Sequence, residues 1–182
     1  MRHLVVLSIL LAPALAFAQP ALTAETQPAD SDAGSYLQLG AVVGAIRSNS
    51  ANTGSFYGAI PLEGGYHLRD SSLWLHGQVA LGALAGIDEQ TFNSSFFEAR
   101  GGIETRGCIL AGKACVVGGV DLGVRREYLM AYDHIDSINA VIVPRAGLDV
   151  GSDHFRLRPG MELATGTDGF SVGLSLAAAY VW

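Results

Sequence analysis

Acidic and basic side chains recur at every second position in the middle and later parts of the sequence. Glu98, Arg100 and Glu104, for example, share one phase of this alternation. Side chains two residues apart in a β-strand point to the same side, so these groups would gather on one face. Carboxylates and guanidiniums at that spacing could transfer protons, hold ions or pair with one another. The residues in such phases are seven acids and six arginines: Glu63, Glu98, Arg100, Glu104, Arg106, Asp121, Arg125, Glu127, Arg145, Asp149, Arg156, Arg158 and Glu162.

Other residue types that could carry chemistry are scattered. His134, Asp136 and Ser137 are the types of a catalytic triad, but triad members usually come from distant segments, so a solvated turn is predicted there. Glu63 with His67, and His76 further along the chain, could handle protons, and hydrogen-bonded filling of an interior is the favoured interpretation. The glycines form no phosphate-binding motif. We therefore predict no catalytic residue, no metal site and no cofactor.

The N-terminal residues resemble a targeting signal. A positive start, an apolar stretch from Leu4 to Leu11 and the small residues Ala16 and Ala18 are typical of a secretory signal peptide, predicted over residues 1–18. Residues 19–34 contain two prolines, three acids and few large apolar side chains, which favours a flexible lead segment. The remaining chain is expected to lie outside the cytoplasm.

The composition excludes several classes of protein. Charged residues make up 15% of the 182 residues and hydrophobic residues 49%, and the mean hydropathy is +0.32. This is too apolar for a disordered chain, yet no apolar run reaches the roughly 20 residues of a spanning helix. A net charge of −6 and a single lysine, Lys113, argue against a nucleic-acid binder.

The two cysteines, Cys108 and Cys115, are separated by six residues that include Gly112. In an oxidising compartment they are expected to form a disulfide that staples a hairpin. Zinc would require four ligands, and no further cysteine or histidine adjoins the pair, so metal binding is disfavoured.

Eight windows over residues 35–182 share one pattern, in which about every second residue is apolar and polar turn-rich stretches separate the windows. The last window shows it best: Phe170, Val172 and Leu174 lie on one face, and small residues such as Ser171 and Gly173 lie on the other. This pattern predicts an all-β, eight-stranded, antiparallel up-and-down barrel with no required helix.

Two architectures fit such alternation, because a soluble barrel points its apolar face inward and a membrane barrel points it to lipid. The signal peptide, the near absence of lysine and the balance of opposite charges favour the transmembrane barrel. So do aromatic residues of the apolar phase, which fall at strand ends and would form two girdles. The predicted girdle residues are Phe56, Tyr66, Phe97, Phe155, Phe170, Tyr180 and Trp182.

A barrel of eight strands is only wide enough inside for side chains. The charged residues are therefore expected to pair with one another and to close the lumen, since unpaired buried charges would be prohibitive. The first and last strands carry mainly small inward residues, such as Gly40 and Ser175. This wall is expected to leave space for the arginines of later strands.

The chain resembles the small outer-membrane barrels of the OmpA/OmpX type over residues 36–182. The most specific element is the final strand, in which Ser175, Tyr180 and Trp182 are similar to the signal recognised by the barrel-assembly machinery. Ala177 stands where glycine is usual. The resemblance implies a Gram-negative outer membrane with a periplasmic N-terminus, contact with lipid and lipopolysaccharide, and recognition by the assembly machinery; a monomer is expected.

The leading hypothesis for function is a non-enzymatic barrel with a structural or surface-interaction role. One alternative is an outer-membrane hydrolase that modifies lipid A, which would need histidine and serine on the lipid-facing surface. Another is a narrow-conductance channel through the charged lumen. Neither the ligand nor the partner follows from the sequence.

Overall fold

A computed structural model describes residues 34–48, 54–69, 71–86, 94–110, 112–129, 136–167 and 169–182. The predicted signal peptide and residues 19–33 of the lead segment lie outside the described residues, as does His134. Within the described residues, no helix is long and apolar enough to cross a membrane.

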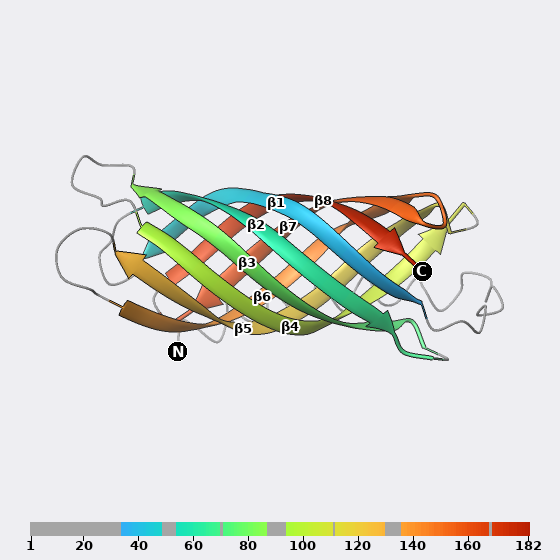
Figure 1. The fold of residues 1–182 in the computed structure, drawn as a ribbon, viewed down its shortest axis with the longest axis horizontal. Coiled ribbons are helices and arrows are strands. Elements are labelled where there is room, and N and C mark those ends of the chain that lie inside the picture. The colour runs from blue at the N-terminus through green and yellow to red at the C-terminus, as the bar shows by residue number, and fades with distance from the viewer. Residues whose placement is uncertain are drawn as a thin grey trace, which may run out of the picture. The chain divides into compact units, whose positions relative to one another are not determined.

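Eight antiparallel strands close into one barrel, in which each strand pairs with its sequence neighbours and β1 pairs with β8 (Figure 1). This confirms the predicted fold class. The strands are β1 (Ser35–Ser48), β2 (Gly54–His67), β3 (Leu73–Gly86), β4 (Ser94–Ile109), β5 (Ala114–Leu129), β6 (Asp136–Gly151), β7 (Phe155–Gly166) and β8 (Gly169–Val181).

The register of the strands sets the tilt of the barrel. Following cross-strand partners once around from Gln38 leads back to β1 at Ser48, ten residues further along, by way of Glu63, Gln78, Arg100, Gly123, Val141, Gly166 and Gly169. A stagger of this kind requires strands tilted by roughly 35–45° to the barrel axis. Side chains alone fill the interior of such a barrel.

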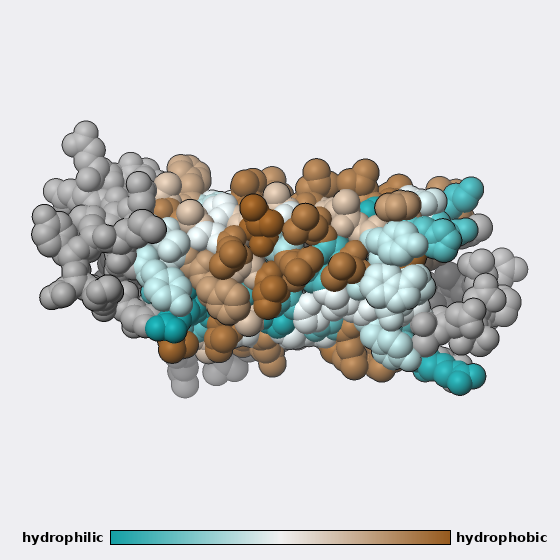
Figure 2. Space-filling model, viewed as in Figure 1, coloured by the Kyte–Doolittle hydropathy of each residue, from teal (hydrophilic) through white to brown (hydrophobic). Residues whose placement is uncertain are grey.

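The polarity of the barrel wall is inverted relative to a soluble protein. Leu39, Leu81 and Leu174 point outward with 58%, 68% and 65% of their surface exposed, whereas Asp121 is fully buried at 0%. In the face shown in Figure 2, hydrophobic side chains cover the middle of the barrel, and paler and hydrophilic residues lie toward its ends. The apolar phase of the alternating sequence therefore lies on the outside of the barrel, and the charged phase lies on the inside.

The connection between β4 and β5 is short, because β4 runs on to Ile109 and β5 begins at Ala114. Cys108 and Cys115 are direct cross-strand partners, which extends the ladder. Gly112 adopts a φ of 80° in the remaining turn, a conformation that glycine takes without steric cost.

The small inward wall of β1 and β8 accommodates an aromatic ring as well as arginines. The ring of Tyr57 lies against Gly44 and Gly173: a Cβ on Gly44 would stand 2.5 Å from Tyr57 Cε1, and one on Gly173 would stand 2.2 Å from Tyr57 Oη. Contacts this short cannot exist, so the two glycines make room for the tyrosine. The sequence analysis expected arginines in this space and did not include Tyr57.

Replacing Gly173 by alanine is expected to lower the free energy of unfolding by about 1–3 kcal/mol, because the new methyl group overpacks the lumen. Gly118→Ala is the matched control, since a Cβ there meets nothing within 4 Å. Urea unfolding followed by tryptophan fluorescence measures both variants. Equal stabilities of the two variants would contradict the close packing of Tyr57.

Two prolines interrupt the ladder between β6 and β7. Arg145 pairs with Glu162 and Gly147 pairs with Gly160, but the pairing stops on either side of this stretch. The interruptions contain Pro144 and Pro159, which have no N–H to donate. This seam is therefore held by fewer backbone hydrogen bonds than a continuous ladder of the same length.

Candidate functional site

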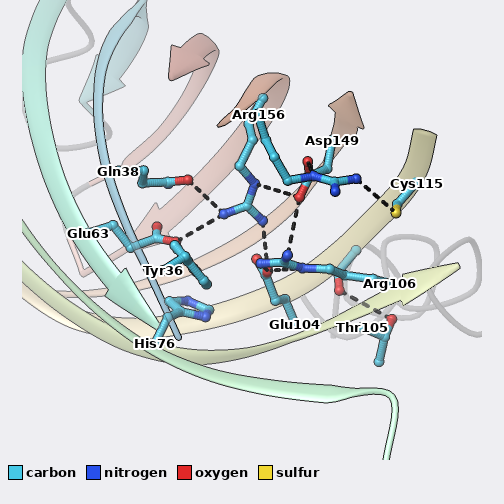
Figure 3. Close-up of polar contacts among 12 residues, drawn as sticks. Tyr36, Gln38, Glu63, His76, Glu104, Thr105, Arg106, Cys115, Asp149 and Arg156 are labelled. Atoms are coloured by element: carbon cyan, nitrogen blue, oxygen red, sulfur yellow. Dashed lines mark hydrogen bonds and ion pairs between the residues drawn. The ribbon is translucent and has the colours of Figure 1, made fainter. Parts of the chain in front are cut away.

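The half of the lumen nearer the β2–β3 and β4–β5 connections holds a group of charged side chains, here called the central charge cluster. Figure 3 shows part of it. Its acids come from β2, β4, β5 and β6, and its arginines from β4, β6 and β7. The members are Glu63, Glu104, Asp121, Asp149, Arg106, Arg145, Arg156 and Arg158, joined by ion pairs. Four acids thus face four arginines.

Glu104 is the most heavily contacted acid of the central cluster. It accepts hydrogen bonds from the Nη2 atoms of Arg106 at 2.6 Å, Arg145 at 2.6 Å and Arg158 at 2.7 Å. Only 1% of its surface is exposed. Charge-assisted hydrogen bonds in a water-poor interior are the strong kind, so this carboxylate ties together three strands of the barrel.

Arg145 lies between several partners in the centre of the cluster. Its guanidinium contacts Glu63, Glu104 and the Nδ1 atom of His76, the last at 3.1 Å. Because Nδ1 faces a donor, it acts as an acceptor, and Nε2 of His76 donates to Asp121 at 2.7 Å. Both ring nitrogens of His76 therefore have partners, and the side chain fills the interior with satisfied hydrogen bonds.

Glu63, His76 and Glu104 also form a group whose ligand atoms lie within 4.8 Å of one another, as a metal site would require. The guanidinium of Arg145 contacts all three of these side chains. Its positive charge therefore takes the place that a metal cation would occupy.

A second, outer charge cluster lies further along the lumen. Arg100 binds Glu162 through two hydrogen bonds of 2.8 and 3.2 Å and also contacts Glu98. Arg125 Nε donates to Glu98 at 2.6 Å. Two acids face two arginines here, and among the described ion pairs none joins this cluster to the central one. Each cluster is thus electrically balanced by itself.

All thirteen predicted lumen residues lie in the inward phase of their strands, and twelve of them belong to the two clusters. The remaining one, Glu127, is half-buried toward the end of the lumen where β5 meets β6. The arrangement can hold the barrel wall together and obstruct passage of solutes.

Comparison with known proteins bears on the fold. No protein-family model matches the sequence, and no curated protein matches it significantly. Among solved structures, Neisserial surface protein A superimposes with a TM-score of 0.65 at 12% identity, over 82% of this chain and 99% of that one. The chain has the fold of the small outer-membrane barrels.

Two further structures share this outer-membrane barrel fold. Ail, the attachment invasion locus protein of Yersinia pestis, has a TM-score of 0.59 at 13% identity, over 83% of this chain and 99% of that chain. The N-terminal barrel domain of Pseudomonas aeruginosa OprF has a TM-score of 0.52 at 11% identity, over 82% and 100%. The resemblance stated from the sequence is thereby confirmed at the level of the fold.

Inward aromatic side chains complete the lumen of the outer-membrane barrel fold, and the sequence interpretation missed them. The guanidinium of Arg106 lies 3.8 Å from the ring centre of Trp74 and 4.9 Å from that of Tyr36. At the other end, Arg125 lies 4.8 Å from the ring of Phe96. The signal was available, because each ring lies in the inward phase of its strand, together with polar, small or charged residues.

The predicted girdle residues are exposed on the outside of the barrel, at two levels. Phe56, Phe97 and Phe170 lie near the β1–β2, β3–β4 and β7–β8 connections. At the opposite end Tyr180 stacks on Trp182, with ring centres 6.0 Å apart, and meets Phe155 edge-on at 5.2 Å. Tyr66 is also exposed at this end.

The residues proposed as an assembly signal lie on β8. Tyr180 and Trp182 point outward, whereas Ser175 is half-buried in the inward phase. Ala177, which stands where glycine is usual, faces Gly40 on β1, and a Cβ on that glycine would lie 2.9 Å from the Ala177 Cβ. The two strands therefore place one small side chain and one glycine opposite each other.

The predicted disulfide between Cys108 and Cys115 is present and joins β4 to β5. Beside it, Arg156 donates to the backbone carbonyl of Gly112 and lies 3.7 Å from the sulfur of Cys115. The disulfide thus closes the turn, and Arg156 links the turn to the central charge cluster.

Replacing both cysteines by serine is expected to preserve the barrel and to lower the free energy of unfolding by about 2–3 kcal/mol, by the loop-entropy estimate. Urea unfolding with and without a reductant measures the effect. The reductant should destabilise the wild-type protein and leave the double variant unchanged. An equal response of the two proteins would show that the disulfide does not stabilise the fold.

Proposed function

We propose that this protein is a non-enzymatic outer-membrane barrel with a structural or surface-interaction role, whose N-terminus lies in the periplasm. The observation that carries the proposal is a lumen filled by two neutral charge clusters inside a wall with an apolar exterior. A wall held in this way suits a rigid anchor whose contacts are made at its rim.

The exterior supports a membrane location. Large apolar side chains are exposed on all eight strands. An apolar surface of this extent would drive aggregation in water, and a bilayer covers it. Closure of the sheet leaves no strand edge with unpaired backbone groups in the hydrocarbon. Solved barrels of the same fold come from outer membranes.

The contacts inside the lumen support a barrel that does not conduct solutes. Glu104 and Glu162 are held by arginines that reach across the lumen from other strands. Moving a solute through the barrel would require these buried pairs to separate, and breaking a buried pair is strongly destabilising. A narrow conductance is therefore disfavoured by the same contacts that support a structural role.

Two partners follow from the proposed location. Arg47 and Arg126 are exposed on the outward phase, opposite Phe170 and Phe97 respectively. Guanidiniums at this level, beside an aromatic girdle, suit the phosphates of lipopolysaccharide. The exposed aromatic end of β8 suits recognition by the barrel-assembly machinery.

Gel migration, fractionation and conductance test the proposal together. The folded protein should be extracted from outer-membrane fractions only by detergent and should change its migration when boiled. It should pass no measurable current in planar bilayers, and its absence should leave the lipid A mass spectrum unchanged. A soluble periplasmic monomer, a steady single-channel current or an altered lipid A profile would each overturn it.

A further inference from the structure

A cavity of about 130 Å³ lies inside the barrel beyond the outer charge cluster, at the end where β1 connects to β2 and β5 connects to β6. Seven strands, all except β4, contribute residues to its lining. The side chains that matter most for its chemistry are Ile46, Leu84, Val141, Ala164, Arg125 and Glu127. It adjoins the outer charge cluster through Arg125, but most of its lining is apolar or small.

The deeper walls of this cavity are apolar. Leu84 packs with Val42, Tyr57 and Phe96 in one cluster of buried side chains, and Ile46 packs against it. Val141 and Ala164 belong to a second buried cluster on the opposite strands. Apolar walls on both sides favour an occupant with a hydrocarbon body, because water in such a space gains few hydrogen bonds.

One polar group in the lining lacks a hydrogen-bond partner. Arg125 is only 3% exposed, its Nε donates to Glu98, and its guanidinium lies against the ring of Phe96. The Nη2 atom of the same guanidinium is buried and makes no hydrogen bond. A buried donor of this kind costs free energy unless something accepts from it.

We propose that this cavity is a binding site for a small monocarboxylate with a short hydrocarbon tail. The carboxylate would accept from Nη2 of Arg125, and the tail would lie between Leu84 and the Val141–Ala164 wall. A space for one water needs about 10–15 Å³ of such volume, so the cavity holds roughly ten non-hydrogen atoms. Hexanoate is a ligand of this size.

Two features of the cavity and its surroundings limit which ligand can bind and whether it can pass through the barrel. Glu127 places a carboxylate in the lining near Arg125, which disfavours anions that carry more than one negative charge. Beneath the cavity, Arg100 and Glu162 form a bidentate pair that obstructs the lumen. The ligand is therefore held at a blind end of the barrel and is not passed through it.

Amide NMR titration of the full chain in phosphatidylcholine nanodiscs tests the proposal with sodium hexanoate as the probe. Saturable shifts are expected at Leu84, Val141 and Ala164. Methyl hexanoate, which has the same tail without the charge, should bind at least tenfold more weakly, because a hydrogen bond to a charged group has been removed. Equal binding of the ester, or no saturable shift, would overturn the proposal.

Three variants assign the binding to this cavity. Arg125→Gln removes the positive charge and the guanidinium donors and should weaken hexanoate binding at least tenfold, and Ala164→Leu fills the space and should abolish it. Lys113→Gln removes one positive charge from the exposed turn at the opposite end and should leave binding unchanged. Migration on unboiled gels verifies that each variant is folded.

The site can be tested even if Arg125→Gln fails to fold through loss of its contact with Glu98. In that case the comparison of hexanoate with its ester, together with the Ala164→Leu variant, tests whether the ligand binds in this cavity. Unchanged binding in a folded Arg125→Gln or Ala164→Leu variant would overturn the site. So would an equal loss of binding in Lys113→Gln, since this would indicate a general charge effect.

Discussion

Glu104→Gln is expected to lower the free energy of unfolding by about 3–5 kcal/mol, the usual cost of removing one partner from a buried ion pair. Glu104 accepts from Arg106, Arg145 and Arg158, and its loss leaves four arginines facing three acids in the central cluster. The amide has nearly the same shape as the carboxylate, so the change isolates charge from packing. Urea unfolding in detergent, followed by tryptophan fluorescence, measures the difference.

Two further variants make the result specific. Asp153→Asn removes the same charge from an exposed turn and should change the stability by less than about 0.5 kcal/mol. The double variant Glu104→Gln/Arg106→Gln restores the balance of charge and should recover part of the loss. If Glu104→Gln were as stable as Asp153→Asn, the central cluster would contribute no net pairing energy.

Arg145→Ala is expected to convert the centre of the cluster into a metal site. In the native protein the guanidinium contacts Glu63, His76 and Glu104, whose ligand atoms lie within 4.8 Å of one another. Removing it leaves two carboxylates and one imidazole around a vacant space, a ligand set that zinc accepts. Zinc at one hundred times its dissociation constant would raise the stability of the variant by about 2.7 kcal/mol.

Unfolding with and without zinc tests this expectation. The variant should be stabilised by the metal and destabilised again by a chelator, whereas the wild-type protein should respond to neither. Adding His76→Gln to the variant removes the nitrogen ligand and should abolish most of the shift. A zinc response of equal size in the wild-type protein would show that Arg145 does not occupy the cation position.

The period of two was enough to predict the architecture and the direction of most side chains. Glu104, Arg125 and Arg158 were expected to point inward, and all three do. The reason is geometric, because successive residues of a strand face opposite sides. The balance of opposite charges in the charged phase and the predicted signal peptide then favoured the membrane barrel over its soluble counterpart. The cysteine spacing likewise predicted the disulfide that is present.

The partners of each charge could not be predicted from the sequence. Arg100 binds Glu162, which lies 62 residues away, and Arg145 binds Glu63 at a separation of 82 residues. Such pairs depend on the stagger between strands and on side chains that reach across the lumen. Alternation specifies whether a side chain points into or out of the barrel. It determines neither the stagger between strands nor which side chains meet across the lumen. The division into two balanced clusters is therefore visible only in three dimensions.

The inward aromatic residues show a different kind of omission. Tyr36, Tyr57 and Phe96 lie in the inward phase of their strands, among small or charged residues. The predicted girdles include only aromatic residues of the outward phase. Their positions beside arginines are recognisable only when the inward phase is examined as a packed interior. The glycines opposite Tyr57 gain their meaning in the same way, since a Cβ at either would collide with the ring.

The central cluster constrains how the protein can enter its membrane. Its members come from β2, β4, β5, β6 and β7. The β1–β2 hairpin brings Glu63 without an inward arginine, while the β7–β8 hairpin brings Arg156 and Arg158 with Glu162 as their one inward acid. A hairpin crossing the hydrocarbon by itself would carry uncompensated charge, at about 2.5–3.5 kcal/mol for each such residue. Translocation strand by strand is therefore unfavourable. The sheet must curl and bring its opposite charges together before, or while, it passes into the bilayer.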